Sequence, residues 1–150
     1  MNKTVTILIA EDDKGHQSLI KRNLKRAGIS NPMIFFDDGQ LILDHLMSPG
    51  NIKDGDSYLL ILDISMPKIS GVEVLDFVKN DMKLKRIPTI MLTTTDDPRE
   101  INNCHELGCN NYITKPIEYE DFINKIMNLG LFLTITENPS INNRKIGEIK

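Results

Sequence analysis

The hydrophobic and polar residues of this chain form blocks that predict five strands alternating with five helices. Short apolar runs predict strands near 4–10, 32–37, 58–63, 88–93 and 111–114. Longer amphipathic stretches predict helices near 14–27, 39–47, 71–82, 97–107 and 118–131. Strands and helices that alternate through short connections are typical of a parallel sheet with helices on both faces. The pattern therefore predicts a doubly wound α/β fold.

The apolar stripes of two helices indicate which faces are buried. The stripe of the helix over 14–27 is interrupted by Asn23, and Gly28 is well placed to end that helix. The stripe of the last helix consists of Tyr119, Phe122, Ile123, Ile126 and Met127. Such stripes are far more often core than cofactor sites, and we interpret both as core.

The third predicted strand ends in the most informative segment of the chain. An unbroken apolar run over 59–62, typical of a strand buried on both faces, is followed at once by Asp63. Pro67 and Gly71 come next; proline has a fixed φ and glycine permits unusual backbone angles. We therefore expect the chain to turn sharply after Asp63.

Polar residues follow three further strands. They are Glu11, Asp12 and Asp13 after the first strand, Thr93, Thr94 and Thr95 after the fourth, and Thr114, Lys115 and Pro116 after the fifth. The carboxyl ends of parallel strands lie along one edge of a sheet, where such folds bind their ligands. The sequence therefore predicts that these residues gather with Asp63 in one crevice.

These features together resemble the receiver domain of two-component response regulators. The acidic pair, the run Asp-x-x-Met-Pro-x-x-x-Gly from Asp63, the hydroxyl after the fourth strand and the Lys-Pro pair occur in the family's order over residues 4–132. The resemblance implies a flavodoxin-like (βα)5 fold with a five-stranded parallel sheet of order 2-1-3-4-5. The Glu of the acidic pair, the Leu-Thr-Thr end of the fourth strand and the apolar stretch after the last helix resemble the small stand-alone regulators associated with phytochromes.

The acidic residues indicate a divalent cation. Two carboxylates about 4 Å apart repel by roughly 4 kcal/mol at an effective dielectric near 20, so a cluster needs a cation or a shifted pKa. Hard oxygen ligands suit Mg²⁺. By resemblance, Asp12 and Asp63 bind Mg²⁺ directly, the backbone carbonyl of Ser65 is a third ligand, and Glu11 binds directly or through water.

The resemblance also implies the chemistry. Asp63 is expected to accept a phosphoryl group from the phosphohistidine of a histidine kinase, while Lys115 and Thr93 stabilise the phosphoryl oxygens. In the family the bond between Lys115 and Pro116 is cis. Thr93 and Tyr112 occupy the positions of the family's switch pair, although a static, half-buried Tyr112 stays an equal alternative.

Two neighbours of the acidic pair are given other roles. Asp13 is interpreted as a carboxylate that begins the helix over 14–27. His16 lies near the expected rim of the crevice, and we interpret it as a solvated helix histidine rather than a ligand.

Composition removes several classes of function. The chain has 150 residues and a net charge of −3 without a basic block, which argues against nucleic-acid binding. We see neither a signal peptide nor an apolar run of the about 18 residues that a membrane span needs. Cys104 and Cys109 form no Cys-x-x-Cys pair and are expected to be reduced thiols of a cytoplasmic protein.

The partners follow from the expected organisation. We expect a receiver domain over 1–133 and a tail over 134–150 without an effector domain, so a signal would leave through protein contacts. The expected donor is a sensor histidine kinase, such as a bacteriophytochrome. Leu131, Phe132 and Leu133 form an apolar cluster. Either the tail covers it locally, or it contributes to a homodimer together with the face of the last two helices and the strand over 111–114.

Three other functions are alternatives to the phospho-acceptor switch. An NTPase lacks the Gly-x-x-x-x-Gly-Lys-Ser/Thr phosphate loop. A phosphohydrolase with an aspartyl nucleophile usually has a second carboxylate two residues later, where this chain has Ser65. A degenerate receiver that only binds partners stays an alternative, although every residue needed for phosphorylation is present. We expect a switch that assists its own phosphorylation and dephosphorylation, not an enzyme.

Overall fold

The protein, seen in a computed structural model that describes residues 4–94, 96–131 and 133–136, contains all ten predicted elements. The strands are β1 (Val5–Ala10), β2 (Met33–Phe36), β3 (Ser57–Asp63), β4 (Thr89–Thr93) and β5 (Asn111–Thr114). The helices are α1 (Lys14–Arg26), α2 (Gly39–Met47), α3 (Gly71–Asn80), α4 (Pro98–Leu107) and α5 (Tyr119–Met127). Among the described residues, no helix has the length and apolar character that crossing a membrane requires.

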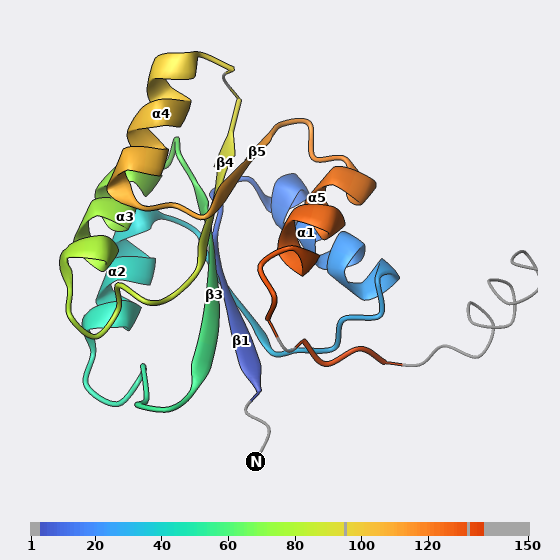
Figure 1. Cartoon of the computed structure of the whole chain (residues 1–150), viewed down its shortest axis with the longest axis horizontal. Coiled ribbons are helices and arrows are strands. Elements are labelled where there is room, and N and C mark those ends of the chain that lie inside the picture. The colour runs from blue at the N-terminus through green and yellow to red at the C-terminus, as the bar shows by residue number, and fades with distance from the viewer. Residues whose placement is uncertain (1–3, 95, 132, 137–150) are drawn as a thin grey trace, which may run out of the picture.

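The strands form one parallel sheet of order β2-β1-β3-β4-β5. Figure 1 shows the sheet nearly edge-on, with α2, α3 and α4 over one face and α1 and α5 over the other. β1 and β3 lie side by side near the middle, with Ile9 opposite Ile61 and Ala10 opposite Leu62. The predicted flavodoxin-like α/β fold and its strand order are confirmed.

Side chains of β3 alternate between two hydrophobic cores. Leu60 and Leu62 pack beneath α2, α3 and α4, whereas Leu59 and Ile61 pack beneath α1 and α5. All four are completely buried, and burial of such a side chain contributes about 1.5–3 kcal/mol. The apolar run is unbroken because both faces of this central strand are covered, and the core therefore holds the strand that ends in Asp63.

The end of α1 agrees with the sequence prediction. Gly28 has a φ of +80°, which a glycine adopts without strain. Its N–H donates to the carbonyl of Lys25, and the N–H of Ile29 donates to the carbonyl of Leu24. These two bonds satisfy carbonyls that the helix end would otherwise leave unpaired.

The predicted end of the last helix at residue 131 is wrong, because α5 ends at Met127. The N–H groups of Leu129 and Gly130 donate to the carbonyls of Ile126 and Met127, three residues back. These bonds are of the 3₁₀ type, and the α-helical pattern ends here. Gly130 then takes a left-handed φ of +71°. The apolar residues up to Leu131 therefore pack against the core from a non-helical segment that follows α5.

This segment runs back along the residues after α1. Ile135 forms an antiparallel bridge with Ile29. The N–H of Ser30 donates to the carbonyl of Thr134 at 2.8 Å, and the N–H of Thr134 donates to the side-chain oxygen of Asn31 at 2.6 Å. The N–H of Thr136 also donates to the carbonyl of Gly28, so this segment is hydrogen-bonded to the domain as far as residue 136.

The apolar cluster at residues 131–133 is partly covered by this domain. Leu131 and Leu133 are half-buried and pack against the core beneath α1 and α5. Phe132 lies outside the described residues. Local packing therefore accounts for two of the three side chains, and the homodimer stays a prediction.

Candidate functional site

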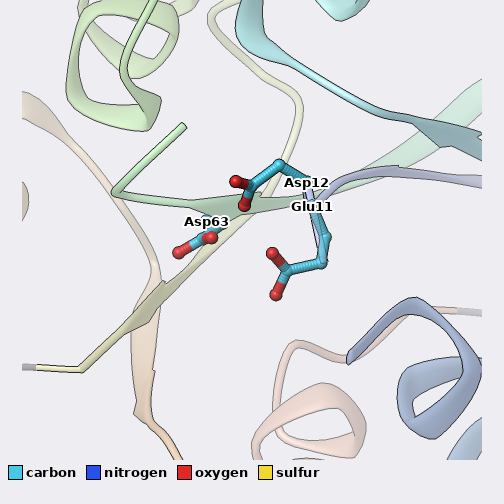
Figure 2. A group of neighbouring side chains, drawn as sticks. All are labelled: Glu11, Asp12 and Asp63. Atoms are coloured by element: carbon cyan, nitrogen blue, oxygen red, sulfur yellow. The ribbon is translucent and has the colours of Figure 1, made fainter. Parts of the chain in front are cut away.

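Three carboxylates come together at the carboxyl end of the sheet, and we refer to Glu11, Asp12 and Asp63 as the carboxylate cluster. Asp63 is the last residue of β3, and Glu11 and Asp12 directly follow the neighbouring strand β1. One oxygen from each carboxylate lies within 4.8 Å of the other two. Figure 2 shows the three side chains directed toward one region. Glu11 is fully buried, Asp63 is 4% exposed and Asp12 is exposed.

The turn after Asp63 depends on a close approach at Gly71. The N–H of Gly71 donates to the carbonyl of Ile64 at 2.9 Å, and a Cβ at this position would lie 2.1 Å from the carbonyl oxygen of Asp63. The left-handed φ in this turn belongs instead to Lys68, at +68°. Gly71 is therefore required for space rather than for unusual backbone angles. Ser70 begins α3 with a capping box, which anchors the far end of the turn.

Side-chain hydrogen bonds fix the turn between β1 and α1. Asp13 begins α1 by accepting a hydrogen bond from the N–H of His16 at 2.9 Å, as predicted. The buried side chain of Gln17 donates to the carbonyl of Glu11 at 2.6 Å and to the carboxylate of Asp37 at 2.9 Å. These bonds hold Glu11 and Asp12 at the edge of the sheet.

Lys115 brings a positive charge into the carboxylate cluster. Its ammonium nitrogen lies 2.6 Å from Oε1 of Glu11 and 3.3 Å from Oδ2 of Asp63. The side chain is only 8% exposed, and the peptide bond to Pro116 is cis. The N–H of Lys115 donates to the carbonyl of Thr93 at 2.7 Å, which joins the ends of β4 and β5. Lys115 and Asp63 therefore lie together at the same edge of the sheet, where the sequence places both residues.

The buried charges shift one another's pKa values. Burial, reinforced by a hydrogen bond and charge repulsion from Glu11, raises the pKa of Asp63 to about 7. Burial alone would raise the pKa of Glu11, but hydrogen bonds from Asp63 and Lys115 outweigh burial and lower it. Burial likewise opposes the charge on Lys115, whereas the two carboxylates raise its pKa. In the metal-free protein near neutral pH, Glu11 and Lys115 are therefore charged, and Asp63 is partly protonated because its pKa lies near that pH.

The remaining predicted site residues lie on the same edge or beside it. Thr93 is buried at the end of β4. Ser65 is exposed in the turn that follows β3. Tyr112 is half-buried in β5, where its ring meets the ring of His105 edge-on at 5.6 Å and lies 4.9 Å from the ammonium of Lys125.

Sequence reasoning underestimated one residue of this site. His16 does lie at the rim, with its side chain 41% exposed, but Nδ1 is 3.1 Å from the ammonium of Lys115 and 3.2 Å from Oε1 of Glu11. The only signal in the sequence is its place in the first turn of a helix that begins at the crevice. His16 and Lys115 are 99 positions apart in the sequence, so no local pattern indicates the contact.

The carboxylate cluster is an acidic metal-binding site suited to a hard divalent cation. Its donors are carboxylate oxygens, and Asp12 is open to solvent, which leaves room for water ligands. Two buried carboxylates share a single lysine, and burial together with Glu11 raises the pKa of Asp63 despite that lysine. A divalent cation compensates such an excess of negative charge, so the residues fit the ion.

Comparison with known proteins finds a matching family model and similar proteins. Residues 7–127 match the family model of the response regulator receiver domain. The response regulator Rcp1 of Synechocystis sp. is 31% identical over 87% of this chain and 90% of its own length. A solved Mn²⁺-bound form of Rcp1 superimposes with a TM-score of 0.68 at 30% identity, covering 88% of this chain and 99% of that one.

Two further structures are similar. A receiver domain from Rhodospirillum rubrum has a TM-score of 0.74 at 42% identity, covering 89% of this chain and 99% of its own. The bacteriophytochrome response regulator RtBRR has a TM-score of 0.77 at 33% identity, covering 91% of this chain and 84% of its own. The chain belongs to the response regulator receiver-domain family, whose members are phospho-acceptor switches rather than catalytic enzymes.

Proposed function

We propose that Asp63 accepts a phosphoryl group from the phosphohistidine of a sensor histidine kinase and that protein contacts transmit the change. The observation that carries this proposal is the position of Asp63, which lies within the carboxylate cluster and 3.3 Å from the ammonium of Lys115. In the transfer, an oxygen of Asp63 attacks phosphorus while the bond from phosphorus to the donor imidazole nitrogen breaks. The imidazole keeps the bonding electrons and takes up a proton, and Asp63 becomes an acyl phosphate.

Other residues at the edge of the sheet balance the charge of the phosphoryl group. We assign the ammonium of Lys115 and the hydroxyl of Thr93 to two of its oxygens. The 2.7 Å backbone bond between these two residues supports the assignment, because it keeps both strand ends in register. The negative charges of the carboxylate cluster would repel the phosphoryl group. The ammonium of Lys115 and the hydroxyl of Thr93 are therefore needed to stabilise the phosphoryl oxygens.

We assign Mg²⁺ to the carboxylate cluster. Asp12, Asp63 and the backbone carbonyl of Ser65 are the proposed protein ligands, and Glu11 binds directly or through water. When bound, Mg²⁺ supplies positive charge against the carboxylates and the phosphoryl oxygens. Asp63 can act as a nucleophile only when it is ionised, and a neighbouring cation favours its ionised form against the effect of burial.

The signal is proposed to pass from Thr93 to Tyr112. β4 and β5 are paired with Met91 opposite Tyr112, so the ring stands on the strand next to Thr93. When the Thr93 hydroxyl turns to a phosphoryl oxygen, the Tyr112 ring moves inward. The contacts of this ring with His105 on α4 and Lys125 on α5 would then change. A ring held static by these two contacts is the alternative.

The partners follow from this switch. The proposed donor is a bacteriophytochrome-type histidine kinase, because the similar structures include a bacteriophytochrome regulator. We propose that α4, β5 and α5, together with the apolar cluster at residues 131–133, form the face through which a homodimer assembles. The proposed location is the cytoplasm, and the free thiols of Cys104 and Cys109 agree with a reducing compartment.

Incubation with acetyl phosphate and Mg²⁺, followed by intact-mass measurement, tests the proposal. The expected result is one added phosphoryl group in the wild type and none in Asp63→Asn or in samples with a chelator. A degenerate receiver would show no added group in any sample. An aspartyl phosphohydrolase would release phosphate continuously without accumulating modified protein, and either result would overturn the proposal.

A further inference from the structure

His16 contacts the proposed phosphorylation machinery without belonging to the carboxylate cluster. Its Nδ1 atom lies 3.1 Å from the ammonium nitrogen of Lys115. The backbone N–H of His16 donates to the N-cap carboxylate of Asp13 at 2.9 Å, which fixes the residue in the first turn of α1. The histidine therefore approaches Lys115 from a fixed point of the fold.

The protons around Lys115 determine how His16 interacts. An ammonium group has three N–H donors and no acceptor. Three acceptors surround this one, at 2.6 Å on Glu11, 3.1 Å on His16 and 3.3 Å on Asp63. Because the ammonium cannot accept a hydrogen bond, a bond between the two groups makes Nδ1 of His16 the acceptor and places the ring proton on Nε2. Nδ1 also lies 3.2 Å from Oε1 of Glu11, to which a protonated Nδ1 would donate. We assign the bond to Lys115, because that oxygen of Glu11 already accepts from the ammonium at 2.6 Å. The lysine side chain is 8% exposed, so water has little access to replace a lost acceptor.

The neutral acceptor differs from the other two in its effect on Lys115. Glu11 is a carboxylate 2.6 Å from the ammonium, so its negative charge competes with a phosphoryl group on Asp63 for that ammonium. The imidazole of His16 satisfies one N–H without this competing charge. It restricts the direction of the ammonium while leaving its attraction for phosphoryl oxygens intact.

We propose that His16 is a positioning residue, whose Nδ1 holds the ammonium of Lys115 so that its remaining N–H groups face Asp63 and the phosphoryl group placed there. This role rests on the proposed function of Asp63 and acts through Lys115. Loss of the acceptor leaves a buried N–H without a partner and frees the lysine side chain to turn.

Two variants separate the acceptor from the shape of the side chain. In His16→Asn the side-chain oxygen is bonded to Cγ, as Nδ1 is in histidine, so it keeps an acceptor near the same position. His16→Leu fills similar space without an acceptor. With acetyl phosphate and saturating Mg²⁺, the maximal phosphorylation rate is expected to fall about tenfold in His16→Leu. His16→Asn is expected to stay within about twofold of the wild type.

A double-mutant cycle identifies the residue through which His16 acts. In a Lys115→Met background, the additional change His16→Leu is expected to cause no further decrease in the phosphorylation rate. His45→Leu is the matched control, since His45 is a half-buried histidine of α2 whose ring packs against Phe36 at the end of β2. It is expected to keep the wild-type rate. Unfolding curves and the Mg²⁺ dissociation constant are measured for every variant.

Three results would overturn the inference. They are equal losses in His16→Asn and His16→Leu, independent losses in the double-mutant cycle, or a decrease explained by weaker Mg²⁺ binding or unfolding. Phosphorylation of Asp63→Asn would instead contradict the proposed function itself. The two failures are therefore distinguishable.

Discussion

The ionisation of Asp63 is expected to make the metal-free protein less stable as pH rises. The carboxylate is 4% exposed, and burial together with Glu11 raises its pKa to about 7 from an ordinary value of 3.8. One pKa unit corresponds to about 1.36 kcal/mol, so a difference of about three units sets a ceiling of about 4 kcal/mol. Replacement by Asn, which is neutral and similar in shape, removes this dependence.

The direction follows from where the proton is bound. Between about pH 4 and about pH 7 the native state keeps the proton on Asp63, whereas the unfolded state has lost it. The free energy of unfolding therefore falls as pH rises through this window and levels off above it. Glu11 has the opposite effect, since its pKa is lowered below 4.5, and its contribution is lost only as the pH falls through that lowered value. The Asp63 effect consequently dominates the upper part of the window.

Urea unfolding in the presence of a chelator measures this effect. Between about pH 5 and about pH 8, the free energy of unfolding of Asp63→Asn relative to wild type is expected to increase by about 2–3 kcal/mol. Asp54→Asn is a matched control, because its carboxylate is 95% exposed and its difference from wild type should not change with pH. Parallel pH profiles for wild type and Asp63→Asn would refute the raised pKa of Asp63 and the burial beside Glu11 that causes it.

Three further results are expected. In thermal melts, Mg²⁺ at a hundredfold excess over its dissociation constant should stabilise the wild type by about 2.7 kcal/mol. Asp12→Ala should lose this stabilisation, and an equal shift of the melting temperature in the variant would exclude the exposed Asp12 as a ligand. Gly71→Ala should destabilise the fold by about 1–3 kcal/mol and slow phosphorylation, because its Cβ would meet the carbonyl of Asp63; wild-type unfolding and phosphorylation would contradict this close approach. Phosphorylation should shift the wild type toward a dimer in sedimentation, and Phe132→Glu should weaken that dimer; identical monomer masses would move the output to another partner.

The sequence predicted those parts of the site that depend on strand ends. Apolar runs located the strands, and the parallel topology alone placed Glu11, Asp63 and Lys115 at one edge. Each of these positions follows from local pattern and chain direction. No side-chain conformation had to be known.

Features that depend on packing between distant segments were missed. The contact of His16 with Lys115 requires the path of a long lysine side chain, and residue type and spacing do not encode that path. Gly71 was expected to serve unusual backbone angles, whereas the structure requires it because α3 approaches the backbone of Asp63. The overlong prediction for α5 arose because Leu131 continues the helical pattern but packs after a turn at Gly130.

The central claim is that Asp63 carries the phosphoryl group, and chemical trapping tests it most directly. Borohydride reduces an acyl phosphate on aspartate to homoserine, which marks the modified position permanently. After treatment with acetyl phosphate and Mg²⁺, peptide mass spectrometry is expected to find homoserine at position 63 in the wild type and nowhere in Asp63→Asn. Homoserine at another aspartate, or its absence from position 63 in protein that has gained a phosphoryl group, would contradict the account.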